Sequence, residues 1–367
     1  MFKHFHCFII LFSFLLSCAP AKNRVTKTTN SLAATELLPF GRFRLTDERN
    51  LELISSAVHF GFSFEGAECR IFASLSDANA HNYLQYEMDG SYQKRIKIQG
   101  GSNEPILLTA SNGGRHTVWI YKATEAHTGP IFIQKVEGNS LQIIPNPALP
   151  LIEFIGNSIT CGAAADPSEV PCGTGVYHDQ HNAYYAYGPR VGRSLGTNYI
   201  LSSVSGIGIY RNWNSDGPTM PQVYEKTDFQ NSNPERWNFS NYNPQIVSIA
   251  LGTNDFSNGD GIRARLPFDS ATFTNNYLQF IKLVKSKYPN ARIALLSSPM
   301  VGSNNRVHLQ NILTTIKEKT DAAYPTNKPV ALYFFKPMQA RGCGGHPNIE
   351  DHGLLAEELL PFFKGLL

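Results

Sequence analysis

Residues 40–145 alternate between apolar and polar side chains, which is the period of a β-strand with one buried face. The clearest case runs from Val58 to Phe64, where every second residue is valine or phenylalanine. Further short runs follow, with turns such as Asp89-Gly90 between them, at residues 70–74, 95–98, 106–109, 117–121, 131–134 and 141–144. Many short strands without an intervening helix predict an all-β sandwich, to which we assign residues 36–148.

After Pro150 the pattern changes to apolar strands that alternate with helices. The predicted strands cover residues 151–155, 199–202, 246–251, 293–296 and 330–334. Between them, residues 277–284 and 309–316 place apolar side chains at the i, i+3, i+4, i+7 spacing of a buried helix face. This alternation predicts an α/β domain over residues 149–367, with a parallel sheet, right-handed crossovers and functional loops at the carboxyl ends of the strands.

The composition agrees with two globular domains in a chain of 367 residues. The sequence is 42% apolar and 17% charged, with a net charge of +3. Because the lysines and arginines form no stripe along the chain, the composition excludes a nucleic-acid-binding protein. We expect a neutral substrate and a monomer.

The N-terminus has the pattern of an export signal. Lys3 precedes an apolar run from Phe8 to Leu16, which is too short to remain as a membrane-spanning helix. Leu15-Leu16-Ser17-Cys18 resembles a bacterial lipobox, so we predict a signal peptide over 1–18, a lipidated Cys18 and a polar tether over 19–35. The alternative is ordinary cleavage nearby and secretion without an anchor. In the first case the protein is an exported lipoprotein of the cell envelope, which contacts the membrane only through its lipid anchor. In the second case it is secreted and does not contact the membrane.

Export permits disulfides among the four remaining cysteines, Cys69, Cys161, Cys172 and Cys343. Their pairing stays open: Cys161–Cys172 would pin the loop that follows residue 161, and Cys161–Cys343 is an equally physical rival. No C-x-x-C or H-x-x-x-H pair accompanies these cysteines, so we expect neither a zinc site nor any other cofactor.

Polar residues follow several of the predicted parallel strands. The first strand runs into Gly156-Asn157-Ser158, which places a serine at the carboxyl edge of the sheet, where it could be a nucleophile or only the N-cap of a helix. The next two strands lead to Gly206 and Asn254, and the last one precedes His346. Because parallel strands share one carboxyl edge, we expect these four residues to converge there.

The four blocks resemble those of the SGNH hydrolase superfamily, in which Ser, Gly, Asn and His occur in this order. The resemblance implies a three-layer, flavodoxin-like α/β domain with Ser158 as nucleophile and His346 as general base and then acid. It also implies an oxyanion hole made by the backbone N–H groups of Ser158 and Gly206 and by the Asn254 side-chain amide.

The whole mature chain looks like the acetyl esterases of carbohydrate esterase family 2, which join a jelly-roll sandwich to an SGNH domain. Residues 114–118 and 122–125 resemble the end of that family's jelly roll, residues 158–162 its nucleophile block and residues 342–347 its histidine block. The resemblance implies deacetylation of plant polysaccharides or oligosaccharides, often at position six of hexoses.

Two positions depart from the SGNH pattern. Asn157 stands where the superfamily has Asp, a change that we expect to cost little because Asn makes similar turn hydrogen bonds. Cys343 stands where Asp commonly orients the histidine. Another group must then fix the His346 tautomer, most simply a backbone carbonyl that accepts from Nδ1–H. The resemblance implies such a Ser–His dyad, since members of the esterase family work with one.

Neighbouring residues have simpler structural explanations. Asp255 is expected to brace the Asn254 loop, and Glu350 and Asp351 to occupy the first turn of the last helix, where negative charge is favourable. His352 is expected to be structural. In the long aromatic stretch 210–242, Trp213 is the candidate platform for acyl or sugar groups, with packing beneath the loop as the alternative.

These observations predict a serine esterase that removes acetyl groups from carbohydrate without a metal or organic cofactor. The alternatives are a non-catalytic carbohydrate-binding surface lipoprotein and an SGNH esterase for another acyl ester or thioester. Turnover of p-nitrophenyl acetate that depends on Ser158 separates the enzyme from the binding protein.

Overall fold

The computed structural model describes Met1 and residues 28–367. The predicted signal peptide, the lipobox at Cys18 and the first part of the tether lie outside the described residues. Within residues 28–367, no helix combines the length and apolarity needed to cross a membrane.

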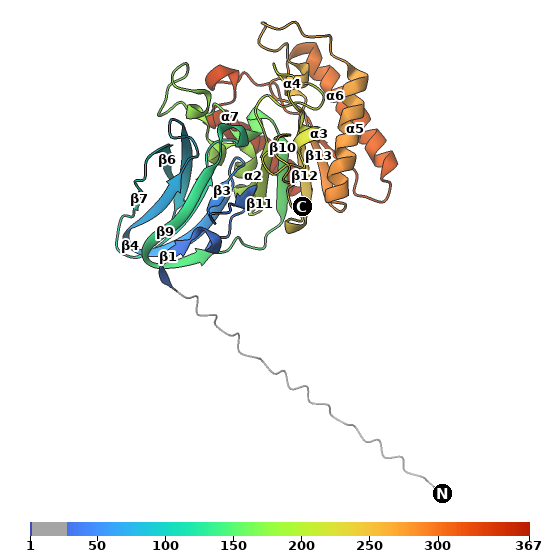
Figure 1. Ribbon diagram of the computed structural model, residues 1–367. Helices are drawn as coiled ribbons and strands as arrows, with labels where there is room; N and C mark the ends of the chain where they lie inside the picture. The colour runs from blue at the N-terminus through green and yellow to red at the C-terminus, as the bar shows by residue number, and fades with distance from the viewer. Residues whose placement is uncertain (2–27) are drawn as a thin grey trace.

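The N-terminal domain is a sandwich built from one antiparallel sheet that folds around an apolar core (Figure 1). Along the sheet the strand order is β2-β3-β9-β4-β8-β5-β6, with β1 paired to β9 and β7 paired to β4. The alternating residues Phe60, Phe62 and Phe64 are fully buried in this core, as the period-two pattern predicts. The strands are β1 Thr29–Ala33, β2 Phe43–Leu45, β3 Leu51–Leu53, β4 His59–Ser74, β5 His81–Met88, β6 Ser91–Gln99, β7 Ile106–Thr109, β8 Arg115–Lys122 and β9 Ile131–Ile144.

Three details differ from the predicted pattern. The predicted runs at 58–64 and 70–74 belong to one long strand, β4, and the runs at 131–134 and 141–144 belong to another, β9. The two strands pair along both runs, because a register shift between Glu65 and Cys69 lets the pairing continue past the break in the alternating pattern. The strands β2, β3 and β5 were not predicted. The expected tether overlaps β1, which pairs with β9 and buries Leu32. The polar composition of Thr29–Ala33 hid this strand, since only one of its residues reaches the core.

The C-terminal domain is a three-layer α/β unit. Its parallel sheet has the order β11-β10-β12-β13-β14. The strands are β10 Leu151–Gly156, β11 Asn198–Ser203, β12 Ile246–Ala250, β13 Arg292–Leu296 and β14 Ala331–Tyr333. The helices are α1 Ser158–Cys161, α2 Tyr187–Leu195, α3 Met220–Val223, α4 Thr253–Phe256, α5 Ser270–Lys287, α6 Ser303–Ala323 and α7 Ile349–Lys364. Short 3₁₀ turns are η1 Ala34–Glu36, η2 Ala126–Thr128, η3 Tyr177–Gln180, η4 Ala183–Tyr185, η5 Phe239–Asn241 and η6 Cys343–Gly345.

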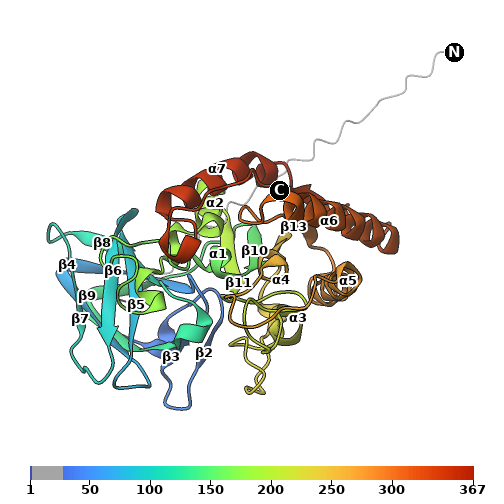
Figure 2. The same cartoon turned by 90° about the horizontal axis from the view of Figure 1, so that it is seen from above.

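Side chains that alternate along the parallel strands pack on opposite layers. Ile152 and Phe154 of β10 face the cluster that holds the apolar sides of α2 and α7, whereas Ile155 faces the cluster of α5 and α6. Figure 2 shows these helices on either side of the sheet and the sandwich beside them. The five predicted strands, the two helices predicted from the apolar pattern and the expected last helix are therefore present.

The two domains share buried surface. Ile54 and Ala126 of the sandwich belong to the same apolar cluster as Val204 and Ile207, which flank the loop after β11. The fully buried Arg42 donates from Nη1 to the carbonyls of Tyr224 and Lys226 in the α/β domain, at 2.9 and 2.6 Å. The sandwich therefore packs directly against the loops that follow the strands of the parallel sheet.

Candidate active site

The register of the parallel sheet brings three of the predicted blocks together. Gly156 of β10 lies beside Ser203 of β11 and Ala250 of β12. Ser158, Gly206 and Asn254 each follow these aligned residues by two to four positions. They therefore leave the sheet at the same carboxyl edge.

Ser158 is the first residue of α1. Its predecessor Asn157 caps this short helix by accepting from Ile159 N–H at 3.1 Å, so the asparagine makes the turn bond expected of it. Gly156 allows the turn to be tight, because a Cβ there would lie 2.0 Å from Thr160 Oγ1. Ser158 is 7% exposed, so little of the residue reaches solvent.

His346 meets Ser158 although the two lie 188 residues apart: Nε2 is 2.9 Å from Ser158 Oγ. The other ring nitrogen, Nδ1, lies 3.3 Å from the backbone carbonyl of Cys343, in the place where a carboxylate would otherwise stand. With Nδ1–H donating to this carbonyl, Nε2 is the acceptor for the serine proton. Burial lowers the pKa of His346, since a charged ring is poorly solvated there, so the imidazole is neutral near neutral pH.

The loops that carry Gly206 and Asn254 are tied to each other. Gly206 has φ of +75°, a left-handed conformation that favours glycine. Asn254 Nδ2 donates to the Ile207 carbonyl at 2.7 Å, which uses one of its two amide hydrogens. The Asp255 carboxylate accepts from the backbone N–H groups of Ile209, Tyr210 and Arg211, so it braces the loop as expected.

The acidic residues near His346 also have the expected structural contacts. Glu350 and Asp351 lie in the first turn of α7. Asp351 accepts from the backbone N–H groups of Asn348 and Arg341 and from the Arg341 side chain, so its carboxylate is committed to the helix start. His352 is fully buried, and burial lowers its pKa to about 3.

Trp213 is adjacent to the Gly206 loop and partly exposed. Its backbone N–H donates to the Gly206 carbonyl at 2.8 Å, and the residue is 41% exposed. The other tryptophan of this stretch, Trp237, instead stacks on Tyr242 and is 7% exposed. Packing beneath the loop therefore describes Trp237, whereas Trp213 stays partly exposed.

The disulfide joins Cys172 to Cys343, so both pairings expected for Cys161 are wrong. Cys161 ends α1 beneath the site, where its buried thiol lies 3.2 Å from Ser203 Oγ and 3.3 Å from Glu125 Oε2. Cys172 lies in the exposed loop after α1 and can reach the histidine block. The disulfide therefore anchors the loop after α1 to Cys343, whose carbonyl contacts His346.

The sequence analysis missed Tyr177, which lies in η3 on the same loop. Its ring centroid is 6.1 Å from that of His346, and its hydroxyl is 3.3 Å from Ser205 Oγ. The residue is 47% exposed. Together with Trp213, it supplies an exposed aromatic ring near the Ser158–His346 pair. No sequence pattern marks Tyr177, because its position depends on the fold of the loop.

Glu125 belongs to the segment that resembles the end of the family's jelly roll, and its side chain reaches from the sandwich to the site. Its buried carboxylate accepts from Ser205 N–H at 2.6 Å, immediately before Gly206, and lies 3.7 Å from His181 Nε2. Burial alone would raise the pKa of Glu125, but the interactions with His181 and Ser205 outweigh it and hold the pKa at about 2. Glu125 is therefore ionised and holds the loop that leads to Gly206 from the other domain.

Comparisons with known proteins agree with this geometry. Residues 40–147 match the carbohydrate esterase 2 N-terminal family, and residues 154–332 match the GDSL-like lipase/acylhydrolase family. The parallel sheet, the Ser158–His346 pair and these matches define a carboxylic ester hydrolase of the GDSL type. Because the N-terminal match is to the carbohydrate esterase 2 domain, the chain joins a carbohydrate esterase 2 N-terminal domain to a GDSL-like hydrolase domain.

Characterised relatives cover most of the chain. An acetylxylan esterase/glucomannan deacetylase of Cellvibrio japonicus is 24% identical over 97% of this chain and 96% of its own length. The cellulase/esterase CelE of Acetivibrio thermocellus is 27% identical over 89% of this chain, which corresponds to 39% of that longer protein. Among solved structures, a family two carbohydrate esterase from Clostridium thermocellum in complex with cellohexaose has a TM-score of 0.77 at 27% identity. It covers 90% of this chain and all of the compared chain.

Proposed function

We propose that the protein removes O-acetyl groups from plant polysaccharides or oligosaccharides such as xylan and glucomannan, including the 6-O position of hexoses, through an acyl-enzyme on Ser158. The observation that carries the proposal is the 2.9 Å contact between Ser158 Oγ and His346 Nε2 at the carboxyl edge of the sheet. The named activities of the relatives supply the substrate class.

The reaction follows from the contacts of the two residues. His346 Nε2 accepts the Ser158 proton while Oγ attacks the acetyl carbonyl carbon. The negative charge that develops on the carbonyl oxygen is stabilised by N–H groups of Ser158, Gly206 and the Asn254 side chain. His346 then gives its proton to the departing sugar hydroxyl, and an acetyl ester remains on Ser158.

Water then hydrolyses the acetyl-serine, and His346 again acts first as base and then as acid. His346 Nε2 removes a proton from water, the resulting hydroxide attacks the acetyl-serine carbonyl, and the Ser158 hydroxyl leaves with the proton from His346. The Cys343 carbonyl keeps the imidazole oriented through Nδ1 and favours the imidazolium that forms between steps. The mechanism needs no carboxylate on the histidine.

The sugar is held by neutral surfaces. Trp213 and Tyr177 offer exposed aromatic faces near the pair, and such faces stack on the apolar side of sugar rings. We assign Trp213 as the platform for the carbohydrate, with Tyr177 as a second aromatic ring near His346. The protein acts outside the cytoplasm, where its substrates occur, and Cys18 carries a lipid anchor.

Acetate release tests the proposal. Wild-type protein and Ser158→Ala are compared on acetylated xylan, acetylated glucomannan and acetylated cello-oligosaccharides, with the product linkage read by NMR. The proposal expects serine-dependent release of acetate from at least one of these carbohydrates. Equal release by Ser158→Ala, or turnover of p-nitrophenyl acetate without release from any carbohydrate, contradicts it.

A further inference from the structure

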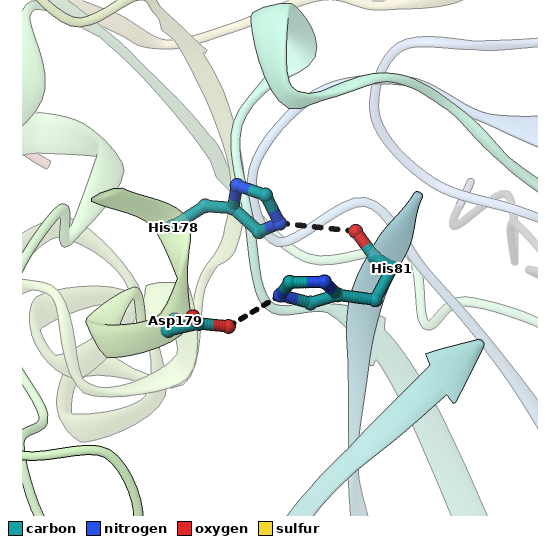
Figure 3. A group of neighbouring side chains, drawn as sticks. All are labelled: His81, His178 and Asp179. Atoms are coloured by element: carbon teal, nitrogen blue, oxygen red, sulfur yellow. Dashed lines mark hydrogen bonds and ion pairs between the residues drawn. The ribbon is translucent and has the colours of Figure 1, made fainter. Parts of the chain in front are cut away.

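Two histidines and an aspartate meet where the sandwich touches the loop after α1. Figure 3 shows His81, the first residue of β5, facing His178 and Asp179 of η3. One potential ligand atom from each side chain lies within 4.8 Å of the other two. Elsewhere among the described residues no such group of three is found. The sequence gives no hint of it, because His81 is almost a hundred residues from the other two and no ligand motif spans them.

Hydrogen bonds already tie the His81 side chain to Asp179 and the His178 side chain to the backbone of His81. His81 Nε2 lies 2.5 Å from Asp179 Oδ1, and His178 Nε2 lies 3.0 Å from the His81 carbonyl. The two imidazole rings have a centroid separation of 4.8 Å. Both histidines are only partly buried, which leaves the cluster accessible from solvent.

The carboxylate is held in place by further groups, as ligands of bound metals commonly are. Tyr83 donates its hydroxyl proton to Asp179 Oδ1 at 2.7 Å, and Val176 N–H donates to Oδ2 at 2.7 Å. Such outer contacts orient a ligand and usually matter for metal affinity. Asp179 therefore presents an oriented oxygen to the two imidazoles.

The donor set selects a class of metal. Imidazole nitrogens suit zinc and similar transition metals, whereas calcium and magnesium prefer oxygen ligands only. Tetrahedral zinc places its ligand atoms about 3.3 Å apart, which follows from metal–ligand distances of about 2.0–2.1 Å. His81 and Asp179 must separate slightly to reach this spacing, and His178 must exchange its bond to a carbonyl for the metal. Three protein ligands leave a fourth position for water.

We propose that His81, His178 and Asp179 bind a divalent transition metal of the zinc class, which fastens η3 to the sandwich. The metal plays no part in the ester chemistry, because none of its ligands contacts Ser158. Its effect is structural: η3 also carries Tyr177, whose ring lies near His346. Binding at this site therefore tightens the rim of the active site.

Metal binding is measured directly on protein that is prepared without a histidine tag and freed of metal with a chelator. Titration with ZnCl₂ in a calorimeter should give one site per chain, and saturating Zn²⁺ should raise Tm by roughly 3 °C or more. His178→Ala and His81→Ala should each weaken binding at least about tenfold. His178→Ala is the more informative variant, because its side chain makes only one hydrogen bond, to a carbonyl.

His127→Ala is the matched control, since His127 also contacts a carbonyl of another segment through Nε2, that of Phe229, but belongs to no such cluster. It should bind Zn²⁺ as the wild type does, and so should the inactive Ser158→Ala, which separates this proposal from the esterase assignment. Absence of heat and of a Tm shift up to millimolar Zn²⁺ overturns the proposal. Unchanged binding in His178→Ala, or an equal loss in His127→Ala, also overturns it.

Discussion

Replacement of Glu125 by glutamine tests whether the sandwich domain supports catalysis. The carboxylate accepts from Ser205 N–H at 2.6 Å and from the Cys161 thiol at 3.3 Å, and it faces His181 at 3.7 Å. Glutamine has nearly the same shape, so it can keep a hydrogen bond to Ser205 but without the charge. The variant therefore removes electrostatic support from the loop that leads to Gly206 with little change in packing.

The size of the effect follows from the strength of that bond. Hydrogen bonds to charged groups contribute about 1.5–3 kcal/mol and neutral ones about 0.5–1.5 kcal/mol, so the exchange costs about 1–2 kcal/mol. If the looser loop presents its oxyanion donor less well, this loss falls on the transition state. Because about 1.4 kcal/mol corresponds to a tenfold rate change, kcat should fall about 5- to 30-fold. KM should stay within about twofold, since Glu125 does not line the sugar surface.

Steady-state kinetics with p-nitrophenyl acetate and urea unfolding measure both consequences. Glu52→Gln is the matched control, because Glu52 is also a buried sandwich carboxylate, paired with Arg44, but it does not touch the Gly206 loop. The control should lose stability and keep kcat. The reasoning is refuted if folded Glu125→Gln retains the wild-type kcat, or if Glu52→Gln loses as much of it.

Three further predictions concern the histidine block. Asp351→Asn should keep kcat within about threefold and lose about 1 kcal/mol of stability in urea unfolding, because the Asp351 carboxylate accepts from Asn348 N–H in the capping box of α7; a rate loss equal to that of His346→Ala would refute the dyad. The pKa of His346 is lowered by burial and its neutral form is the base, so the acid limb of kcat/KM should have its midpoint below the pKa of an ordinary histidine; a midpoint at or above the pKa of an ordinary histidine contradicts this. Cys172→Ser frees the loop from Cys343, so the free energy of unfolding should fall by about 2–4 kcal/mol and kcat should fall as well. An unchanged urea unfolding curve and an unchanged kcat would show that the disulfide supports neither stability nor catalysis.

The sequence predicts the α/β domain well because its strands are buried on both faces and its helices have one apolar face. Strands such as β10 and β12 therefore appear as continuous apolar runs, and polar residues directly after them mark the functional edge. The sandwich is harder to predict in detail. β5 and β1 mix polar and apolar residues, and the bulges in β4 and β9 interrupt the alternation without ending the strand.

The parts of the site that the sequence did not predict depend on contacts between distant segments. The disulfide partner of Cys172 depends on the path of the loop after α1, and chain spacing does not encode that path. Glu125 contacts Ser205 from another domain, 80 residues away. The Ser158–His346 pair was predictable because each residue follows a recognisable strand. Side chains that support the pair from loops have no such marker.

The acyl-enzyme is the central claim, and mass spectrometry of protein quenched during turnover of p-nitrophenyl acetate tests it most directly. The mechanism predicts that the intact protein gains the mass of one acetyl group and that the peptide containing Ser158 carries it. Ser158→Ala should show neither the adduct nor the burst of product that precedes steady turnover. An adduct on another residue, or wild-type turnover by Ser158→Ala, would contradict the account.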